Sequence, residues 1–217
     1  MEQVTLQFLR DLQSNNNKEW MDANRKRYEA AKQDFEHFVA ELIGGLGKMD
    51  PSLADLQAKK CIFRLNRDIR FSKDKSPYKT NFGAAFSRGG KNSAAAAYYF
   101  HLEPGASFAG GGIWMPEADR LRRIRQEIDY NFDEFKAIVQ DKKFKKYFPK
   151  MEGDALTRPP KGYEDTNPAI AYLKLKSFTV GAELPDKDLS ASGLYQKTMD
   201  IYTLMQPFIQ FLNRAVE

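Results

Sequence analysis

The sequence is poor in the residues that hold metals and disulfides. It contains one cysteine, Cys61, and two histidines. A single cysteine excludes an intramolecular disulfide, and we expect a reducing, cytoplasmic compartment. One cysteine and two histidines are also too few for the usual structural zinc sites. We therefore predict no metal site, and no motif indicates a particular cofactor.

Long apolar runs are missing as well. No stretch approaches the roughly 20 residues that span a bilayer, and residues 1–13 lack the apolar core of a signal peptide. We therefore expect that this protein is not bound to a membrane. Hydrophobic residues make up 42% and charged residues 29%, which excludes a disordered chain. The length of 217 residues fits one domain, which we predict to cover residues 1–217.

Helical patterns occupy the two ends of the chain. At the N-terminal end we expect a helix at 6–13 capped by Thr5, and a helix at 18–43 capped by Asn17 and ended by three glycines. A short helix should follow Asp50 and Pro51. Toward the C-terminal end, helices are expected at 117–129, at 132–140 capped by Asn131, at 142–148, at 167–173, and at 190–217 with a kink or break at Pro207.

Strand patterns lie between these helices. Residues 61–71 alternate between apolar and polar side chains, which predicts an extended, half-buried segment. Further strands are expected at 81–87, 95–103, 107–114 and 177–183, and short turns favour an antiparallel meander. Residues 151–165 should form a surface loop. This order predicts an α+β fold, with a mainly antiparallel sheet packed against helices from both ends of the chain.

Positive charge is concentrated in one segment. The formal net charge is +5, and residues 59–91 carry 10 basic and 2 acidic residues, a net charge of +8. Such an excess raises the local concentration of anions. The alternative is a solvated basic face.

A distinctive motif, Phe63-Arg-Leu-Asn-Arg-Asp-Ile-Arg-Phe-Ser-Lys-Asp-Lys-Ser-Pro-Tyr-Lys79, lies within this basic segment. It resembles the hallmark of a bacterial family of conserved hypothetical proteins, a domain of unknown function. Residues 99–112, 158–163 and 167–178 resemble the same family in the expected order. The resemblance implies a single α+β domain, and it implies no activity.

The first candidate site is the cluster Arg64, Asn66, Arg67, Asp68 and Arg70. Guanidinium groups match phosphate and carboxylate oxygens, and Asp68 could orient one of them. On a straight strand, Arg64 and Arg70 would lie about 20 Å apart, so a turn at residues 66–68 would be needed to bring them together. The alternative is a structural network in which Asp68 pairs with Arg64 or Arg70 and ties the sheet to a helix.

The second candidate site is the loop that follows. Lys75 and Lys79 could bind phosphate, and Tyr78 could stack on a base or sugar or simply fill the core. The alternative is a solvated basic loop. His101 and Asp68 are weaker candidates for acid–base catalysis, because a strand histidine is more often structural. Lys161, in the surface loop, could close over a ligand as part of a lid.

Three functions are compatible with these patterns. The first is binding of an anionic, phosphate-like ligand, with or without an enzymatic reaction on a phosphorylated or acidic small molecule. The second is non-enzymatic nucleic-acid binding, which predicts an extended basic surface with exposed aromatic side chains. The third is an interaction or scaffold module with a structural Arg–Asp network. No pattern indicates an oligomeric state.

Overall fold

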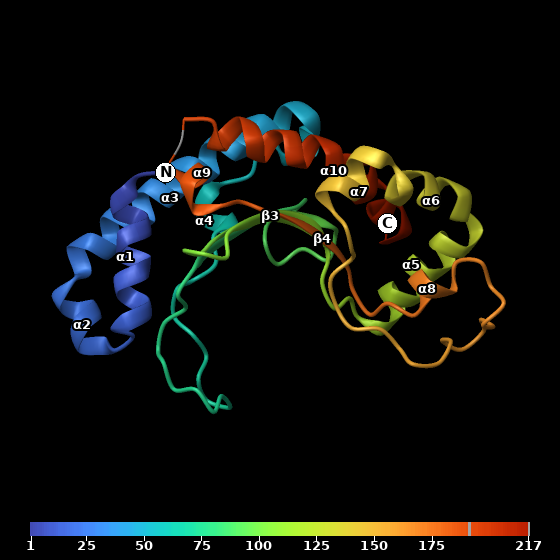
Figure 1. The fold of residues 1–217 in the computed structure, drawn as a ribbon, viewed down its shortest axis with the longest axis horizontal. Coiled ribbons are helices and arrows are strands. Elements are labelled where there is room, and N and C mark those ends of the chain that lie inside the picture. Colours follow the sequence, from blue (N-terminus) through green and yellow to red (C-terminus); the bar gives the residue numbers. More distant parts are fainter. Residues whose placement is uncertain (191, 217) are drawn as a thin grey trace. The chain divides into compact units, whose positions relative to one another are not determined.

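The structure, a computed structural model, describes residues 1–190 and 192–216. Its four strands, β1 (Phe82–Phe86), β2 (Ala97–Leu102), β3 (Phe108–Ile113) and β4 (Phe178–Glu183), form one antiparallel sheet in the order β1-β2-β3-β4 (Figure 1). Every strand lies inside a range predicted from alternation and turn residues. The α+β class and the antiparallel meander are therefore confirmed.

The described residues group into two compact units. The first comprises Met1–Lys91, Tyr99–Ala109 and Glu183–Asp200, and the second comprises Asn92–Tyr98, Gly110–Ala182 and Ile201–Glu217. Three of the four strands contribute residues to both units. The single domain over 1–217 stays a prediction.

The first unit has a helical layer on one face of its strands. Its helices are α1 (Gln3–Ser14), α2 (Lys18–Ala23), α3 (Arg25–Met49), the 3-10 turn η1 (Pro51–Leu53), α4 (Ala58–Cys61), α9 (Asp186–Leu189) and the start of α10 (Leu194–Val216). Phe35 of α3 stacks on Phe82 of β1 at 5.2 Å between ring centroids, and Phe38 meets Phe100 of β2 at 5.0 Å. Side chains of β2 alternate, so Phe100 faces α3 while Tyr99 and His101 face the other way.

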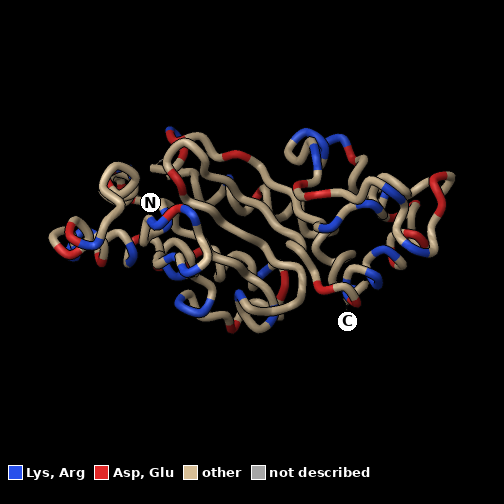
Figure 2. Tube along the Cα trace, turned by 90° about the horizontal axis from the view of Figure 1, so that it is seen from below, with Lys and Arg blue, Asp and Glu red and all other residues tan. Residues whose placement is uncertain are grey.

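The second unit is built around the rest of α10. Its other helices are α5 (Ala118–Tyr130), α6 (Phe132–Gln140), α7 (Lys142–Tyr147) and α8 (Ile170–Leu173). Phe135 of α6 meets Phe211 of α10 at 5.1 Å, and Phe144 of α7 meets Phe208 at 5.8 Å. Basic and acidic residues are interleaved on these helices (Figure 2), as expected for solvated helical faces.

Several helix boundaries were predicted wrongly. Thr5 does not cap α1, because the helix begins at Gln3 and the buried Thr5 hydroxyl donates to Asp34 at 2.6 Å. The predicted 18–43 helix is two helices divided at Asn24. Asn131 does occupy the N-cap position of α6, but its side chain makes no capping hydrogen bond, and its amide donates to Glu127 instead. Asn17 does cap α2, by accepting from the Trp20 N–H, and Pro51 opens η1 as expected.

The three glycines do not end α3, which continues to Met49. A Cβ on Gly45 would lie 2.5 Å from the Tyr195 hydroxyl, and one on Gly47 would lie 2.8 Å from the Cα of Ala54. Glycine therefore permits close packing there, inside the helix. Pro207 does not interrupt α10, which runs through it; the predicted end of this helix at Glu217 lies outside the described residues. Within the described ranges, no helix combines the length and apolarity needed to cross a bilayer.

The 61–71 segment forms one side of a projecting arm, by which we mean residues 62–80 (Figure 1, teal). Its two sides are joined by an antiparallel bridge between Asn66 and Tyr78, and a bridge between Ile62 and Ala84 continues the pairing onto β1. The predicted alternation holds for Leu65, which is buried, and for its neighbours Arg64 and Asn66, which are exposed. It fails at Phe71, whose side chain is 95% exposed.

Candidate anion-binding site

The tip of the arm is braced from within by Arg67. Its guanidinium pairs with Asp74 and donates to the carbonyl of Ser76 at 3.1 Å, and its side chain is only 26% exposed. Asp74 in turn accepts from the hydroxyl and N–H of Ser76 at 2.7 and 2.9 Å. These Ser76 bonds, with Arg67 after them, lower the pKa of Asp74 to about 2. Arg67 therefore holds the turn together.

Two further tip cations, Arg70 and Lys75, also have partners within the arm. Arg70 makes a two-bond contact with Asp68, at 2.9 Å from Nε to Oδ1 and 2.6 Å from Nη2 to Oδ2. This contact is the main cause of the lowered pKa of Asp68. Lys75 donates to the carbonyl of Ile69 at 3.0 Å. No turn forms at residues 66–68, and Arg67 and Arg70 are each paired with an aspartate of the arm.

A different group of cations gathers at the base of the arm. We call Phe63, Arg64, Lys79 and Lys91 the basal cluster. The ammonium nitrogens of Lys79 and Lys91 lie 5.6 and 5.8 Å from the centroid of the Phe63 ring. Lys91 also donates to the carbonyl of Ile62. A cation close to the face of an aromatic ring is stabilised by the ring's quadrupole, which offsets part of the repulsion between these two like charges.

The basal cluster lacks neutralising carboxylates. Among the described residues, Arg64 has no ion-pair or hydrogen-bond partner, and the ammonium groups of Lys79 and Lys91 pair with no acid. Burial lowers the pKa of Lys79, and the charges of Arg64 and Lys91 lower it further. The charge of Arg64 does contribute to the lowered pKa of Asp68, but both oxygens of that carboxylate bond to Arg70.

A chain of hydrogen bonds runs along β2 beside the cluster. The Tyr99 hydroxyl lies 3.1 Å from Nδ1 of His101, and Nε2 of His101 lies 2.9 Å from Glu103. The hydroxyl of Thr80 donates to the other oxygen of Glu103 at 2.7 Å. The ring of Tyr99 meets Phe63 edge-on at 6.2 Å. This chain therefore links the residue next to Lys79 with the ring on which the cations lie.

One residue of the helical layer anchors the arm. The side chain of Asn16, between α1 and α2, donates to the carbonyl of Tyr78 at 2.9 Å and accepts from its N–H at 3.1 Å. The ring of Tyr78 is only 9% exposed, so it fills the core, one of the two roles predicted for it. Asn66 is exposed and pairs with Tyr78 through the backbone.

The sequence of the whole chain was compared with known proteins. The model of the family described as "Conserved hypothetical protein (DUF2461)" matches residues 4–211. The chain belongs to this family. The resemblance inferred from the motifs is thereby confirmed at the level of the family. No curated protein and no solved structure matches the chain.

The DUF2461 family description names no activity, so the two candidates for acid–base catalysis are judged by their surroundings. Both ring nitrogens of His101 are within hydrogen-bond distance of protein groups, and its side chain is only 14% exposed. Asp68 is similarly engaged by Arg70. Both side chains are therefore engaged by protein groups, and their part in catalysis stays a prediction. Lys161 lies exposed in the 151–165 segment of the second unit, and its part in a lid stays a prediction.

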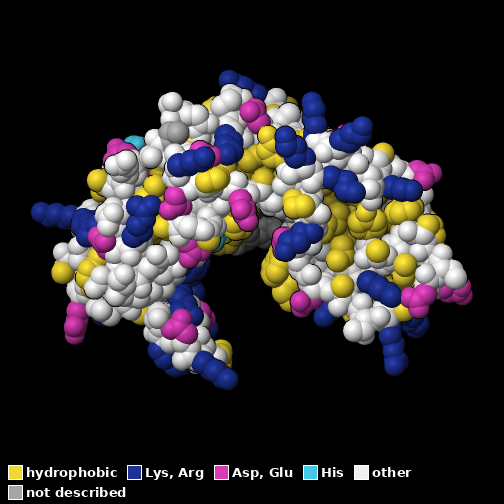
Figure 3. All heavy atoms as spheres, in the orientation of Figure 1, with side chains coloured by type: hydrophobic (Ala, Val, Ile, Leu, Met, Phe, Trp, Pro, Cys, Tyr) yellow, Lys and Arg dark blue, Asp and Glu magenta, His cyan; other side chains and the backbone are white. Residues whose placement is uncertain are grey.

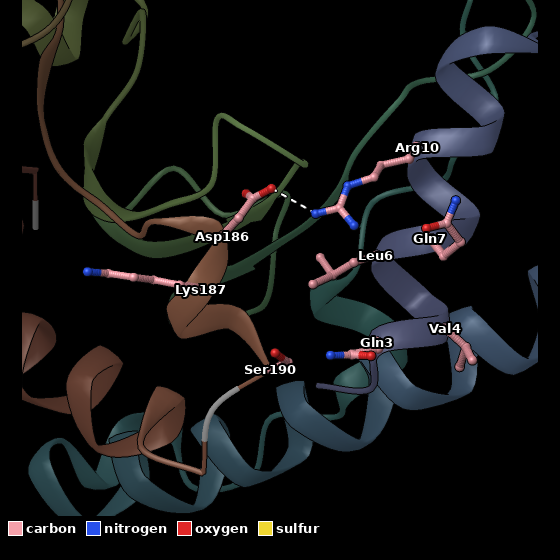
Figure 4. A pocket seen from close by; sticks show the side chains of 8 residues that line it. All are labelled: Gln3, Val4, Leu6, Gln7, Arg10, Asp186, Lys187 and Ser190. Carbon is pink, nitrogen blue, oxygen red and sulfur yellow. Dashed lines mark hydrogen bonds and ion pairs between the residues drawn. The ribbon is translucent and has the colours of Figure 1, made fainter.

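A pocket of about 530 Å³ lies elsewhere in the first unit of this DUF2461 chain, between α1 and α9 (Figure 4). Arg10 pairs across it with Asp186 at 2.9 Å, and Asp186 also accepts from the Gly105 N–H at 2.8 Å. The guanidinium of Arg10 is thus already paired with a carboxylate. The basal cluster, whose cations are not matched in this way, is the stronger candidate for an anion site.

Sequence reasoning missed two members of the basal cluster. Lys91 falls in the basic segment but was not among the predicted site residues, and Phe63 lies in the alternating 61–71 segment. Only the pairing of residue 62 with residue 84 and the turn before β2 bring Lys91 over Phe63. The segmental charge of +8 was the one signal that pointed to both lysines.

Proposed function

We propose that this protein binds a phosphate-like anion at the basal cluster. The observation that carries the proposal is that Lys79 and Lys91 lie over one ring, and that the charge of Arg64 acts on Lys79, without carboxylate partners for the three cations among the described residues. Buried or half-buried like charges are unfavourable unless something compensates them. A bound anion would supply that compensation.

The three cations offer complementary donors. Arg64 presents a forked guanidinium that suits two oxygens of one phosphate or carboxylate, and the two lysines act as point charges. Lys79 has its pKa lowered by burial and by its cationic neighbours, so an anion beside it would raise that pKa again. Anion binding should therefore strengthen as pH falls from alkaline values toward neutrality, because Lys79 becomes fully protonated over that interval.

The hydrogen-bonded chain on β2 supports this site. Burial raises the pKa of Tyr99 to about 12, so its hydroxyl stays protonated even in alkaline solution and can donate to His101. The chain fixes Tyr99 against Phe63 and fixes Thr80 beside Lys79. We propose that it positions the binding residues, and no reaction is assigned to it.

Thermal-shift measurements with sulfate, phosphate, pyrophosphate and nucleotides test the proposal. A ligand that binds only the folded state raises the melting temperature by mass action. We expect pyrophosphate or a nucleotide to stabilise the wild type, and Arg64→Gln or Lys79→Gln to lose most of that stabilisation.

Arg70→Gln is the matched control, because it removes the same charge from an exposed arginine of the same segment that is already paired with Asp68. It should retain the ligand-dependent shift. An equal loss of the shift in Arg64→Gln and Arg70→Gln would reduce the effect to net charge and contradict a defined site.

A further inference from the structure

The tip of the arm presents an aromatic ring to solvent. Phe71 is 95% exposed, and the guanidinium of Arg70 lies 5.9 Å from its ring centroid. Arg70 is itself held by its two-bond contact with Asp68. The ring and its cationic neighbour therefore form an ordered pair at the end of the arm.

The tip is held by its own hydrogen bonds. Arg67 braces the turn through Asp74 and Ser76, and Lys75 closes it onto Ile69. An internally braced turn loses little conformational freedom when it meets a partner. The aromatic side chain is left outside this brace, where it buries no apolar surface within the chain.

Cations continue from the tip to the base of the arm. Lys73 and Lys75 are exposed beside Phe71, and Arg64 is exposed near the base. Arg64 and Phe71 are seven positions apart, which corresponds to at most about 25 Å of extended backbone. Figure 3 shows cationic side chains on this projection. A single phosphate cannot contact such a long track, whereas a polymer of phosphates can.

We propose that the arm binds single-stranded nucleic acid, with Phe71 stacking on a base and the basic residues contacting phosphates. This inference rests on the proposed anion site, which would hold one phosphate of the strand at the basal cluster. Aromatic rings combined with a cationic track are the usual means of binding single strands without sequence preference. An unpaired base is available for stacking without the free-energy cost of opening a duplex.

A lipid surface is the less favoured partner. Insertion into a bilayer would gain apolar burial from one exposed side chain at the tip, since Ile69 beside it is already half-buried. One phenylalanine contributes only a marginal membrane affinity by itself. A nucleic acid strand would use the ring and the separated cations together.

Fluorescence anisotropy with labelled 12-nucleotide single strands of DNA and RNA tests the inference at about 50 mM salt. Loss of stacking on one aromatic side chain should make the dissociation constant of Phe71→Ala for the single strands about 5- to 100-fold larger than that of the wild type. Phe71→Trp, which keeps an aromatic ring at this position, should bind the single strands as tightly as the wild type. Tyr130→Ala is the matched control, because Tyr130 is an exposed aromatic residue of the second unit at 74% exposure, and it should bind like the wild type.

Salt dependence provides a separate measure of the phosphate contacts. Each phosphate neutralised on a single strand contributes about 0.7 to the slope of log affinity against log salt. Arg64→Gln should reduce that slope by about 0.7, while Phe71→Ala should leave it unchanged. Equal slopes for Arg64→Gln and wild type would remove the basal cluster from the strand-binding site and overturn the inference.

The remaining outcomes separate the two proposals. If pyrophosphate stabilises the wild type through Arg64 but Phe71→Ala binds single strands as tightly as wild type, the anion site stands and the inference is overturned. If neither pyrophosphate nor any oligonucleotide binds, both fail. Tighter binding to duplex than to single strand, or Phe71-dependent binding to vesicles of phosphatidylserine without oligonucleotide binding, would also overturn it.

Discussion

At the scale of single residues, the partner of each cation decides its role. Arg64, Arg67 and Arg70 are equivalent in composition and lie within seven positions. Arg67 and Arg70 each have an aspartate partner inside the arm, whereas Arg64 has none among the described residues. The sequence predicted a cluster of these arginines, but it could not assign Asp68 to Arg70 or Asp74 to Arg67, because those pairs depend on where the turn of the arm lies.

Tyr99 gives a prediction about pH at this scale. Its pKa is raised from 10 in the unfolded chain to about 12 in the folded protein. The folded state therefore retains a proton that the unfolded state loses, so this stabilisation is complete below pH 10 and is lost as pH rises toward 12. Over that interval the free energy of unfolding should fall by about 2–3 kcal/mol more in the wild type than in Tyr99→Phe.

Urea denaturation of both proteins from pH 8 to pH 12 measures this difference. Other groups with shifted pKa values are common to the two proteins, and their contributions cancel. Parallel stability curves across pH 10–12 would show that burial does not hold the Tyr99 proton.

At the scale of elements, apolar periodicity located the strands and most helices. Glycine and proline, in contrast, predicted helix ends that the structure does not have. The pattern predicted all four strands and the bounds of α6 because those segments are buried on defined faces. Gly44, Gly45 and Gly47 resembled a helix end, yet α3 passes through them. Close approach of Ala54 and of the Tyr195 side chain explains two of these glycines, and no local pattern contains that information.

Two of these glycines should respond oppositely to alanine. A Cβ on Gly44 meets no atom within 4 Å, so Gly44→Ala should raise the free energy of unfolding by about 0.5–1 kcal/mol, the usual difference inside a helix. A Cβ on Gly47 would lie 2.8 Å from the Ala54 backbone, so Gly47→Ala should lower it. Urea denaturation compares the two variants, and equal stabilisation by both would contradict close packing at Gly47.

At the scale of the whole molecule, the chain is divided into two compact units but not into two sequence segments. It passes between them five times, and four of these passages fall inside β2, β3, β4 or α10. A linker, by contrast, is usually exposed and outside regular structure. This supports the proposal that residues 1–217 fold as one domain.

The two tryptophans allow that proposal to be tested. Trp20 lies in the first unit and Trp114 in the second. The variants Trp20→Phe and Trp114→Phe each retain one fluorophore, which reports on one unit. If the chain is one cooperative domain, each variant's fluorescence transition in urea should coincide with its own far-ultraviolet circular dichroism transition. A fluorescence transition clearly separated from the circular dichroism transition in either variant would indicate that the units unfold independently.

The sequence alone determined the α+β class, the four strands and the segment in which positive charge is concentrated, because periodicity and charge are local properties of the chain. Tertiary structure decided which cations remain without acidic partners. That outcome depends on the antiparallel pairing of the arm, which sets Arg64 beside Lys79 and leaves the aspartates to the tip. It also decided that Lys91 joins Phe63 and that Phe71 lies outside the core, since both follow from contacts between residues distant in the chain.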